Sequence, residues 1–172
     1  RCFESLGHRP DHASKSAESN PSVPEVDPIT ASVIQHRLVA IAEEMGEAML
    51  RTSYSQILNA SRDFSTAICG EKGRLVAQAE HIPVHVGALP WAVKAVVEFF
   101  ADDIDDGDVF LLNDPYTAGG NHLPDWVIAR PVFVGGELVA FACTRAHQAD
   151  IGGGAAGTYN SEAREIFHEG IR

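Results

Sequence analysis

The chain has 172 residues, of which 45% are hydrophobic, so it is long enough for one domain with a hydrophobic core. Its formal net charge of -11 and sequence pI near 5.0 argue against binding to a phosphate backbone, so nucleic acid is not an expected partner. No apolar run approaches the roughly 20 residues that span a bilayer, and three scattered cysteines fit a reducing compartment, so we expect a cytoplasmic protein that does not act at a membrane.

A tail and a long helix are expected first. Residues 1–26 are rich in Ser, Pro, Glu and His without a helical or strand period, which predicts a disordered tail or linker before a single domain at residues 27–172. Asp27 followed by Pro28 is a good helix start, because Asp accepts from free amides and Pro at the first position has no amide to satisfy. Apolar residues at steps of three and four then predict a core-facing helix to about Thr52.

A β-hairpin and an extended segment are expected next. Residues 64–69 and 74–79 flank the turn sequence GEKG, which is typical of a four-residue hairpin loop. Asp63 is interpreted as a turn or capping carboxylate, with a partner role in a site as the alternative. Pro83 argues against a helix, so His81 and His85 are expected on one face of a short strand. Hydrogen bonding to backbone is favoured for His81, and a site role stays open for His85.

A second helix and a third strand follow. Residues 89–100, opened by Pro90, are predicted to form a helix with an apolar face. Five Asp residues lie within 102–108, but their spacing does not match an EF-hand, so a solvated loop is expected. Residues 109–112 then predict a short buried strand that leads to Asn113.

The stretch 113–150 carries the polar residues on which the functional hypothesis depends. A non-regular loop, NDPYTAGG, precedes the sequence HLPD. Residues 126–134 and 137–145 are rich in β-formers, and the Gly-Gly step between them predicts a two-residue hairpin turn.

The register of this hairpin decides whether its open end can form one site. Counting from the turn pairs Asp125 with Ala146, which puts Asp125 and His147 on opposite faces if both strands are regular. A local irregularity near Pro124 or Arg145 is therefore predicted.

We hypothesise that His122, Asp125 and His147 bind one divalent metal ion. Two neutral imidazoles and one carboxylate suit zinc, manganese or iron and leave coordination positions open for water or substrate. Such an ion polarises a carbonyl group or lowers the pKa of bound water. The alternative is a set of structural histidines, because HxxD also occurs by chance. Four further residues are candidates for a catalytic role or for hydrogen bonding around the ion: Asp150, which is also a possible fourth ligand, His85, Asp114 and Asp63.

The sequence DIGGGAAGT formally matches GxGxxG, but no helix clearly opens after it and no βαβ unit surrounds it. A glycine loop over the site is therefore expected rather than a nucleotide fingerprint. The chain begins at Arg1 and stops within what looks like a helix, so it is expected to be part of a longer polypeptide.

Five segments in this order resemble the amino-terminal part of the hydantoinase B/oxoprolinase family: DPITASVIQHRLVAIAEEMGEAMLRTSYS, SRDFSTAI, GRLVAQAEHIPVHVGALP, LLNDPYTAGGNHLPDWV and RAHQADIGG. The resemblance runs from about Asp27 to Arg172. That family includes subunits or halves of ATP-dependent N-methylhydantoinase, 5-oxoprolinase and lactamase enzymes, and the large subunit of acetone and acetophenone carboxylases.

The resemblance implies a division of labour between two subunits. The partner, a hydantoinase A-type subunit, would bind ATP and phosphorylate the amide or ketone oxygen of the substrate. The B-type subunit would hold the metal and complete hydrolysis or carboxylation. The metal ligands of the carboxylase members match His122, Asp125 and His147 in spacing.

The expected fold is α+β, with a long amino-terminal helix and a second helix packed on a mostly antiparallel sheet, as a fragment of a larger fold. The expected function is the metal-binding subunit of an ATP-dependent hydrolase that opens cyclic amides such as hydantoin, 5-oxoproline or a lactam. A subunit of an ATP-dependent ketone carboxylase and a non-catalytic assembly module are the alternatives.

Overall fold

Helix α1 (Pro28–Thr52) begins where its sequence predicts. In this computed structural model, which describes residues 26–79, 82–155 and 160–172, Asp27 is the N-cap, and its Oδ1 accepts from the amides of Ile29 and Thr30 at 3.0 Å each. The expected tail, apart from Val26, lies outside the described residues. The remaining elements are α2 (Gln56–Ser61), β1 (Phe64–Gly70), β2 (Leu75–Gln78), α3 (Pro83–Phe100), β3 (Phe110–Leu112), β4 (Asp125–Val134), β5 (Glu137–His147) and the 3₁₀ turn η1 (Ile166–His168).

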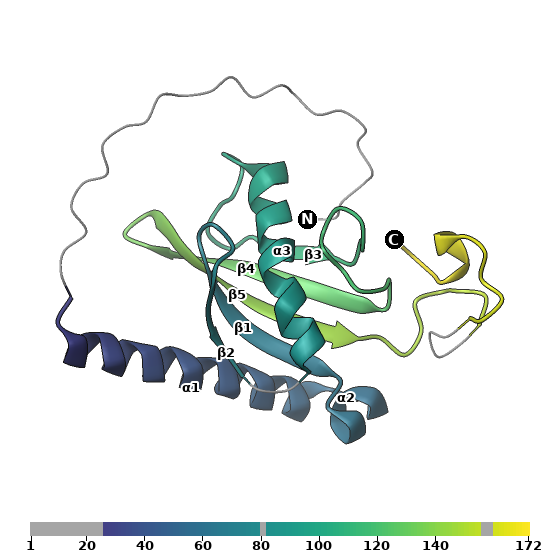
Figure 1. Cartoon of the computed structure of the whole chain (residues 1–172), viewed down its shortest axis with the longest axis horizontal. Coiled ribbons are helices and arrows are strands. Elements are labelled where there is room, and N and C mark those ends of the chain that lie inside the picture. The colour runs from purple at the N-terminus through teal and green to yellow at the C-terminus, as the bar shows by residue number, and fades with distance from the viewer. Residues whose placement is uncertain (1–25, 80–81, 156–159) are drawn as a thin grey trace.

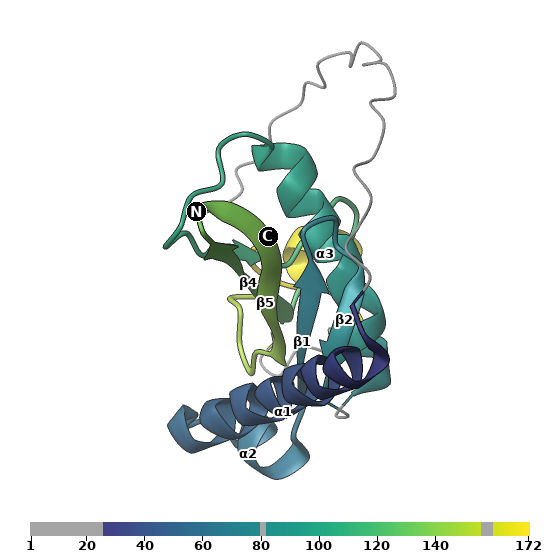
Figure 2. The ribbon, with the colours of Figure 1, turned by 90° about the vertical axis from the view of Figure 1, so that its left-hand side faces the viewer.

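The five strands form one antiparallel sheet in the order β2-β1-β5-β4-β3, with helices on both faces (Figures 1 and 2). On β1, the hydroxyl of Thr66 donates to the carbonyl of Ala42 in α1 at 2.7 Å, so this side chain faces α1. The next residue, Ala67, faces the opposite way and packs in the core with Leu89 and Val93 of α3. The expected α+β arrangement is confirmed, and none of the described helices could cross a membrane.

The first half of α1 differs from the core-facing helix that its apolar periodicity predicts. Ile29, Val33 and Ile34 are 77%, 63% and 50% exposed, and burial begins only in the second half of the helix, at Ala42 and Gly46. Helix α1 packs on β1 and β2, but its first turns project beyond these strands, so their apolar side chains stay exposed (Figure 1).

Helix α3 starts earlier than expected, and the extended segment predicted around Pro83 is wrong. Pro83 occupies the first helical position, where its missing amide costs nothing, and Ile82 before it is extended, as a residue before proline prefers. His85 therefore lies in the first turn of a helix, and His81 lies outside the described residues. Pro90, expected at the start of the helix, lies inside it.

The hairpin of β4 and β5 has the predicted turn and a bulge in an unexpected place. Gly135 and Gly136 both have positive φ, as a two-residue turn of this type requires. Val134 pairs with Glu137 as predicted, but the register shifts between Val132 and Phe133, close to the turn and far from the strand ends where an irregularity was predicted. An extra residue beside a tight turn increases the local twist of the ribbon and shifts all later pairs by one.

Two local features were not predicted. The short helix α2 ends at Ser61, and the next residue, Arg62, adopts a left-handed conformation with φ of 50° and leads the chain into β1. The helix expected at the end of the chain is only η1. It is followed by Gly170 at φ of 139°, where a side chain would collide with Ile151.

Candidate metal centre

The bulge brings the three hypothesised ligands together. It makes Asp125 and His147 direct cross-strand partners, so both side chains lie on the same face of the sheet. Asp125 Oδ1 lies 3.0 Å from His147 Nδ1 and 2.8 Å from His122 Nε2. The ligand atoms of the three residues all lie within 4.8 Å of one another. The irregularity predicted near Pro124 or Arg145 is therefore wrong in its place, but the bulge beside the turn has the expected consequence at the open end of the hairpin.

Hydrogen bonds to backbone carbonyls hold the segments that carry these side chains. The amide of Asp125 donates to the carbonyl of His122 at 3.2 Å, which closes the turn between the two residues. The amide of His147 donates to the carbonyl of Asp63 at 3.1 Å, and the side-chain amide of Asn113 donates to the carbonyl of Leu123 at 2.9 Å. The site therefore connects the start of β1, the end of β5 and the loop before β4.

Asp125 uses its second oxygen for different partners. Its Oδ2 lies 3.3 Å from His85 Nε2 and 3.3 Å from Arg145 Nε. Asp125, His85 and Arg145 are 1%, 4% and 0% exposed, so these groups are almost completely removed from water. Burial alone would raise the pKa of Asp125, but hydrogen bonds from His122 and His85 outweigh it and hold the pKa far below its usual range.

Asp63 lies at the edge of this cluster. Its Oδ1 is 3.5 Å from His85 Nε2, and its Oδ2 is 4.0 Å from His147 Nδ1. The side chain of Asp63 is 32% exposed, so of the two carboxylates, Asp63 and Asp125, it is Asp63 that reaches solvent. A position at a strand entrance suggested a turn role, but the fold also brings Asp63 to the candidate site.

The other two expected residues have local structural partners instead. Asp114 Oδ1 accepts from the amides of Tyr116 and Thr117, and its other oxygen pairs with Arg172. Asp150 is exposed, and its Oδ1 accepts from the amide of Gly152 at 2.8 Å. Among the described residues, neither belongs to the three-residue cluster that could hold a metal.

Arg145 was missed by the sequence analysis as a member of the site. Its position two residues before His147 on a strand was the available signal, because residues at this spacing share a face. Burial lowers the pKa of its guanidinium, and the charge of Asp125 opposes that shift.

Two imidazoles and a carboxylate are ligands that zinc, manganese and iron accept in proteins. With the three ligand atoms converging as they do, the residues fit a single divalent ion. Asp125 stays charged near neutral pH because of its low pKa, which suits a metal ligand.

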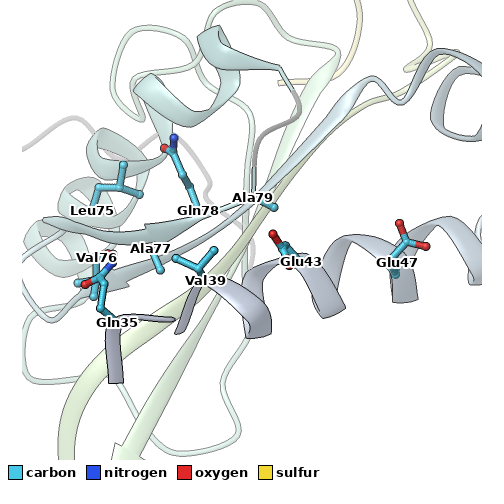
Figure 3. A pocket seen from close by; sticks show the side chains of 9 residues that line it. All are labelled: Gln35, Val39, Glu43, Glu47, Leu75, Val76, Ala77, Gln78 and Ala79. Carbon is cyan, nitrogen blue, oxygen red and sulfur yellow. Dashed lines mark hydrogen bonds between the residues drawn. The ribbon is translucent and has the colours of Figure 1, made fainter. Parts of the chain in front are cut away.

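Two cavities differ in their relation to this cluster. One of about 770 Å³ lies between α1 and β2, with the side chains of Gln35, Val39 and Glu43 along one side (Figure 3), and none of the three candidate ligands lines it. A smaller one of about 380 Å³ is lined by His122 together with residues of the loop before β4 and of the C-terminal segment, which are Pro115, Tyr116, Asn121, Ala163, Arg164, Glu165, Ile166 and Glu169. Of these two cavities, the second is therefore the one that contacts the cluster, through His122.

The chain resembles known proteins over almost all of the described region. A sequence model of the family described as hydantoinase B/oxoprolinase matches residues 27–172. The 5-oxoprolinase of Dictyostelium discoideum is 44% identical over 146 residues, which are 85% of this chain and 12% of that protein.

Two solved structures share the fold. The crystal structure of the ATP-dependent caprolactamase from Pseudomonas jessenii has a TM-score of 0.78 and 39% identity, covering 86% of this chain and 25% of that one. A nucleotide-free structure of acetone carboxylase, described as an ATP-dependent enzyme, has a TM-score of 0.71 and 25% identity, covering 77% of this chain and 18% of that one. The chain thus spans a quarter or less of the length of each of these proteins.

Proposed function

The chain belongs to the hydantoinase B/oxoprolinase family, and from this premise we propose that it forms the metal-binding part of an ATP-dependent hydrolase of cyclic amides. The activity is that of a longer polypeptide in complex with a hydantoinase A-type subunit, which binds ATP. Two similar proteins support this assignment, because 5-oxoprolinase and the ATP-dependent caprolactamase are both named for cyclic amides.

One observation carries the proposal. The ligand atoms of His122, Asp125 and His147 converge within 4.8 Å at the open end of the β4–β5 hairpin, beside a cavity that His122 lines. A divalent ion held there supplies a Lewis acid with coordination positions left for water or substrate.

The residues around the ligands orient them and can hold a proton. His85 and Arg145 contact Oδ2 of Asp125, which leaves Oδ1 directed at the two histidines. Asp63 combines contact with His85 and access to solvent, so it is our candidate for the group that exchanges a proton during ring opening.

Metal analysis of the purified chain tests the proposal. We expect one equivalent of a divalent metal in the wild type and less than about a tenth of that amount in His122→Ala and His147→Ala, because each loses one of only three ligands. His36→Ala is the matched control, since His36 is exposed on α1 and its Nδ1 contacts the carbonyl of Ser32. Metal that persists in both ligand variants would overturn the proposed centre.

A ketone carboxylase is the second candidate, favoured by the likeness to acetone carboxylase. The two functions separate in one assay of the longer polypeptide with its A-type partner and ATP. Release of the ring-opened carboxylate from 5-oxoproline, hydantoin or caprolactam supports the hydrolase. Incorporation of labelled bicarbonate into acetone, without ring opening of any amide, supports the carboxylase.

A further inference from the structure

Arg145 is the buried cation beside the candidate metal centre. Its side chain is 0% exposed, and its Nε lies 3.3 Å from Asp125 Oδ2 as an ion-pair contact without hydrogen-bond geometry. Both Nη atoms are buried without a hydrogen-bond partner among the described residues. A buried guanidinium that forms so few contacts is costly, so stability alone does not explain it.

The oxygen that Arg145 contacts also lies beside His85, which contacts a second carboxylate. His85 Nε2 lies 3.3 Å from Asp125 Oδ2 and 3.5 Å from Asp63 Oδ1, so this imidazole nitrogen lies between two carboxylates. Paired metal sites in hydrolytic enzymes use such residues, often with one carboxylate shared between two ions. Here Oδ1 of Asp125 faces His122 and His147, whereas Oδ2 faces His85 and Arg145.

We propose that Arg145 takes the place of a second cation on Asp125 Oδ2, which limits the centre to one metal ion and keeps Asp125 as a ligand through Oδ1 alone. Unlike a metal ion, the guanidinium is covalently fixed and cannot exchange. Its positive charge repels a divalent ion at the same oxygen, and this repulsion is weakly screened because the site is buried. The inference rests on the proposed metal centre of this chain and makes Arg145 a positioning residue.

Metal stoichiometry tests this role in the 172-residue chain itself. Equilibrium dialysis against Mn²⁺ should saturate at one equivalent for the wild type, even with metal in large excess. Arg145→Met removes the charge at similar length and should bind a second equivalent. Arg145→Lys keeps the charge and should stay at one. Arg130→Met is the matched control, because Arg130 is exposed on β4, and it should also stay at one.

A further variant locates the additional ion. Adding His85→Leu to Arg145→Met removes the imidazole between the two carboxylates and should return the stoichiometry from two to one. Electron paramagnetic resonance of Mn²⁺ gives an independent readout, since two ions that share a carboxylate couple magnetically and one ion does not.

The outcomes separate this inference from the proposed function. A wild type that binds two equivalents, or an Arg145→Met variant that is folded by circular dichroism and still binds one, overturns the role of Arg145 and leaves the metal centre standing. A wild type that binds no metal overturns the centre and the inference with it. If Arg145→Met does not fold, the stoichiometry of the wild type still tests the proposal, because a second equivalent of Mn²⁺ bound to the wild type contradicts it.

Discussion

The face of the sheet under α3 has an apolar middle and a charged end, and both are buried to the same degree. In the middle, Phe141 and Cys143 of β5 are 0% exposed beneath Val93 and Val96 of α3. At the end of the same strand, Arg145 is also 0% exposed. One helix covers both regions, with its first turn over the charged end.

Equal burial has opposite energetic consequences in the two regions. Apolar side chains in the middle stabilise the fold by about 25 cal/mol for each Å² removed from water. The charged end costs desolvation, which the contacts among Asp125, His85 and Arg145 offset only in part. The comparison indicates that the middle maintains the fold, and we propose that the charged end is retained for its chemistry.

Phe141→Ala should have the largest effect on stability. The ring is fully buried in the cluster that α3 covers, so its removal leaves a cavity and lowers the free energy of unfolding by about 3–5 kcal/mol. Urea denaturation followed by circular dichroism measures this. Val139→Ala is the control, since Val139 is 42% exposed at the bulge of the same strand, and it should change the free energy by less than about 1 kcal/mol. A smaller loss for Phe141→Ala than for Val139→Ala would contradict the assignment of the apolar middle as the core.

Asp125→Asn removes the negative charge that pairs with Arg145 at the charged end. Because Arg145 is then buried without its counter-charge, the free energy of unfolding should fall by about 3 kcal/mol in the presence of a chelator. The same variant should also lose the metal, which Phe141→Ala, if it folds, should retain. Asp150→Asn is the control, since that carboxylate is exposed, and both its stability and its metal content should be unchanged. A stable Asp125→Asn protein would show that the charged end tolerates an unpaired guanidinium.

Local chemistry made the framework of the fold predictable. Asp27 before Pro28 marks a helix start by itself, and Gly135 with Gly136 marks a two-residue turn. The extended segment predicted from Pro83 was wrong because proline disfavours the interior of a helix but favours its first position. Only the packing of the following turns on the sheet decides which of the two positions proline takes.

The candidate site was predictable in part for a related reason. His122, Asp125 and His147 follow from a pattern around one hairpin, although the bulge that aligns them lies beside the turn. His85 and Arg145 join them through the packing of α3 across the sheet, which is a non-local contact. Strand periodicity could place Arg145 on the same face as His147 but could not say what lies above it.

Thr66→Val tests the opposite face of the sheet, where a neutral polar contact is buried. The hydroxyl of Thr66 donates to the carbonyl of Ala42 in α1, and a valine of similar shape loses only this hydrogen bond. The free energy of unfolding should fall by about 1 kcal/mol, less than for the charged end. Thr144→Val, at the position directly opposite on β5, is the control and should stay within about 0.5 kcal/mol of wild type.

Asp27→Ala should have the smallest effect, because the capping carboxylate is exposed and acts only on the first turn of α1. Hydrogen bonds from Thr30, opposed only slightly by burial, lower the pKa of Asp27 in the folded protein. The stabilising contribution is therefore present above the unfolded pKa of about 3.9 and is lost as the pH falls through the lower folded value. Thermal unfolding at neutral pH should show a lower midpoint for Asp27→Ala than for wild type, and this difference should shrink at about pH 3. Asp27→Asn, which keeps an acceptor oxygen but not the charge, should have a midpoint between those of Asp27→Ala and wild type at neutral pH. A difference between Asp27→Ala and wild type that grows on acidification would contradict the capping role, since protonation removes the charge that the helix amides stabilise.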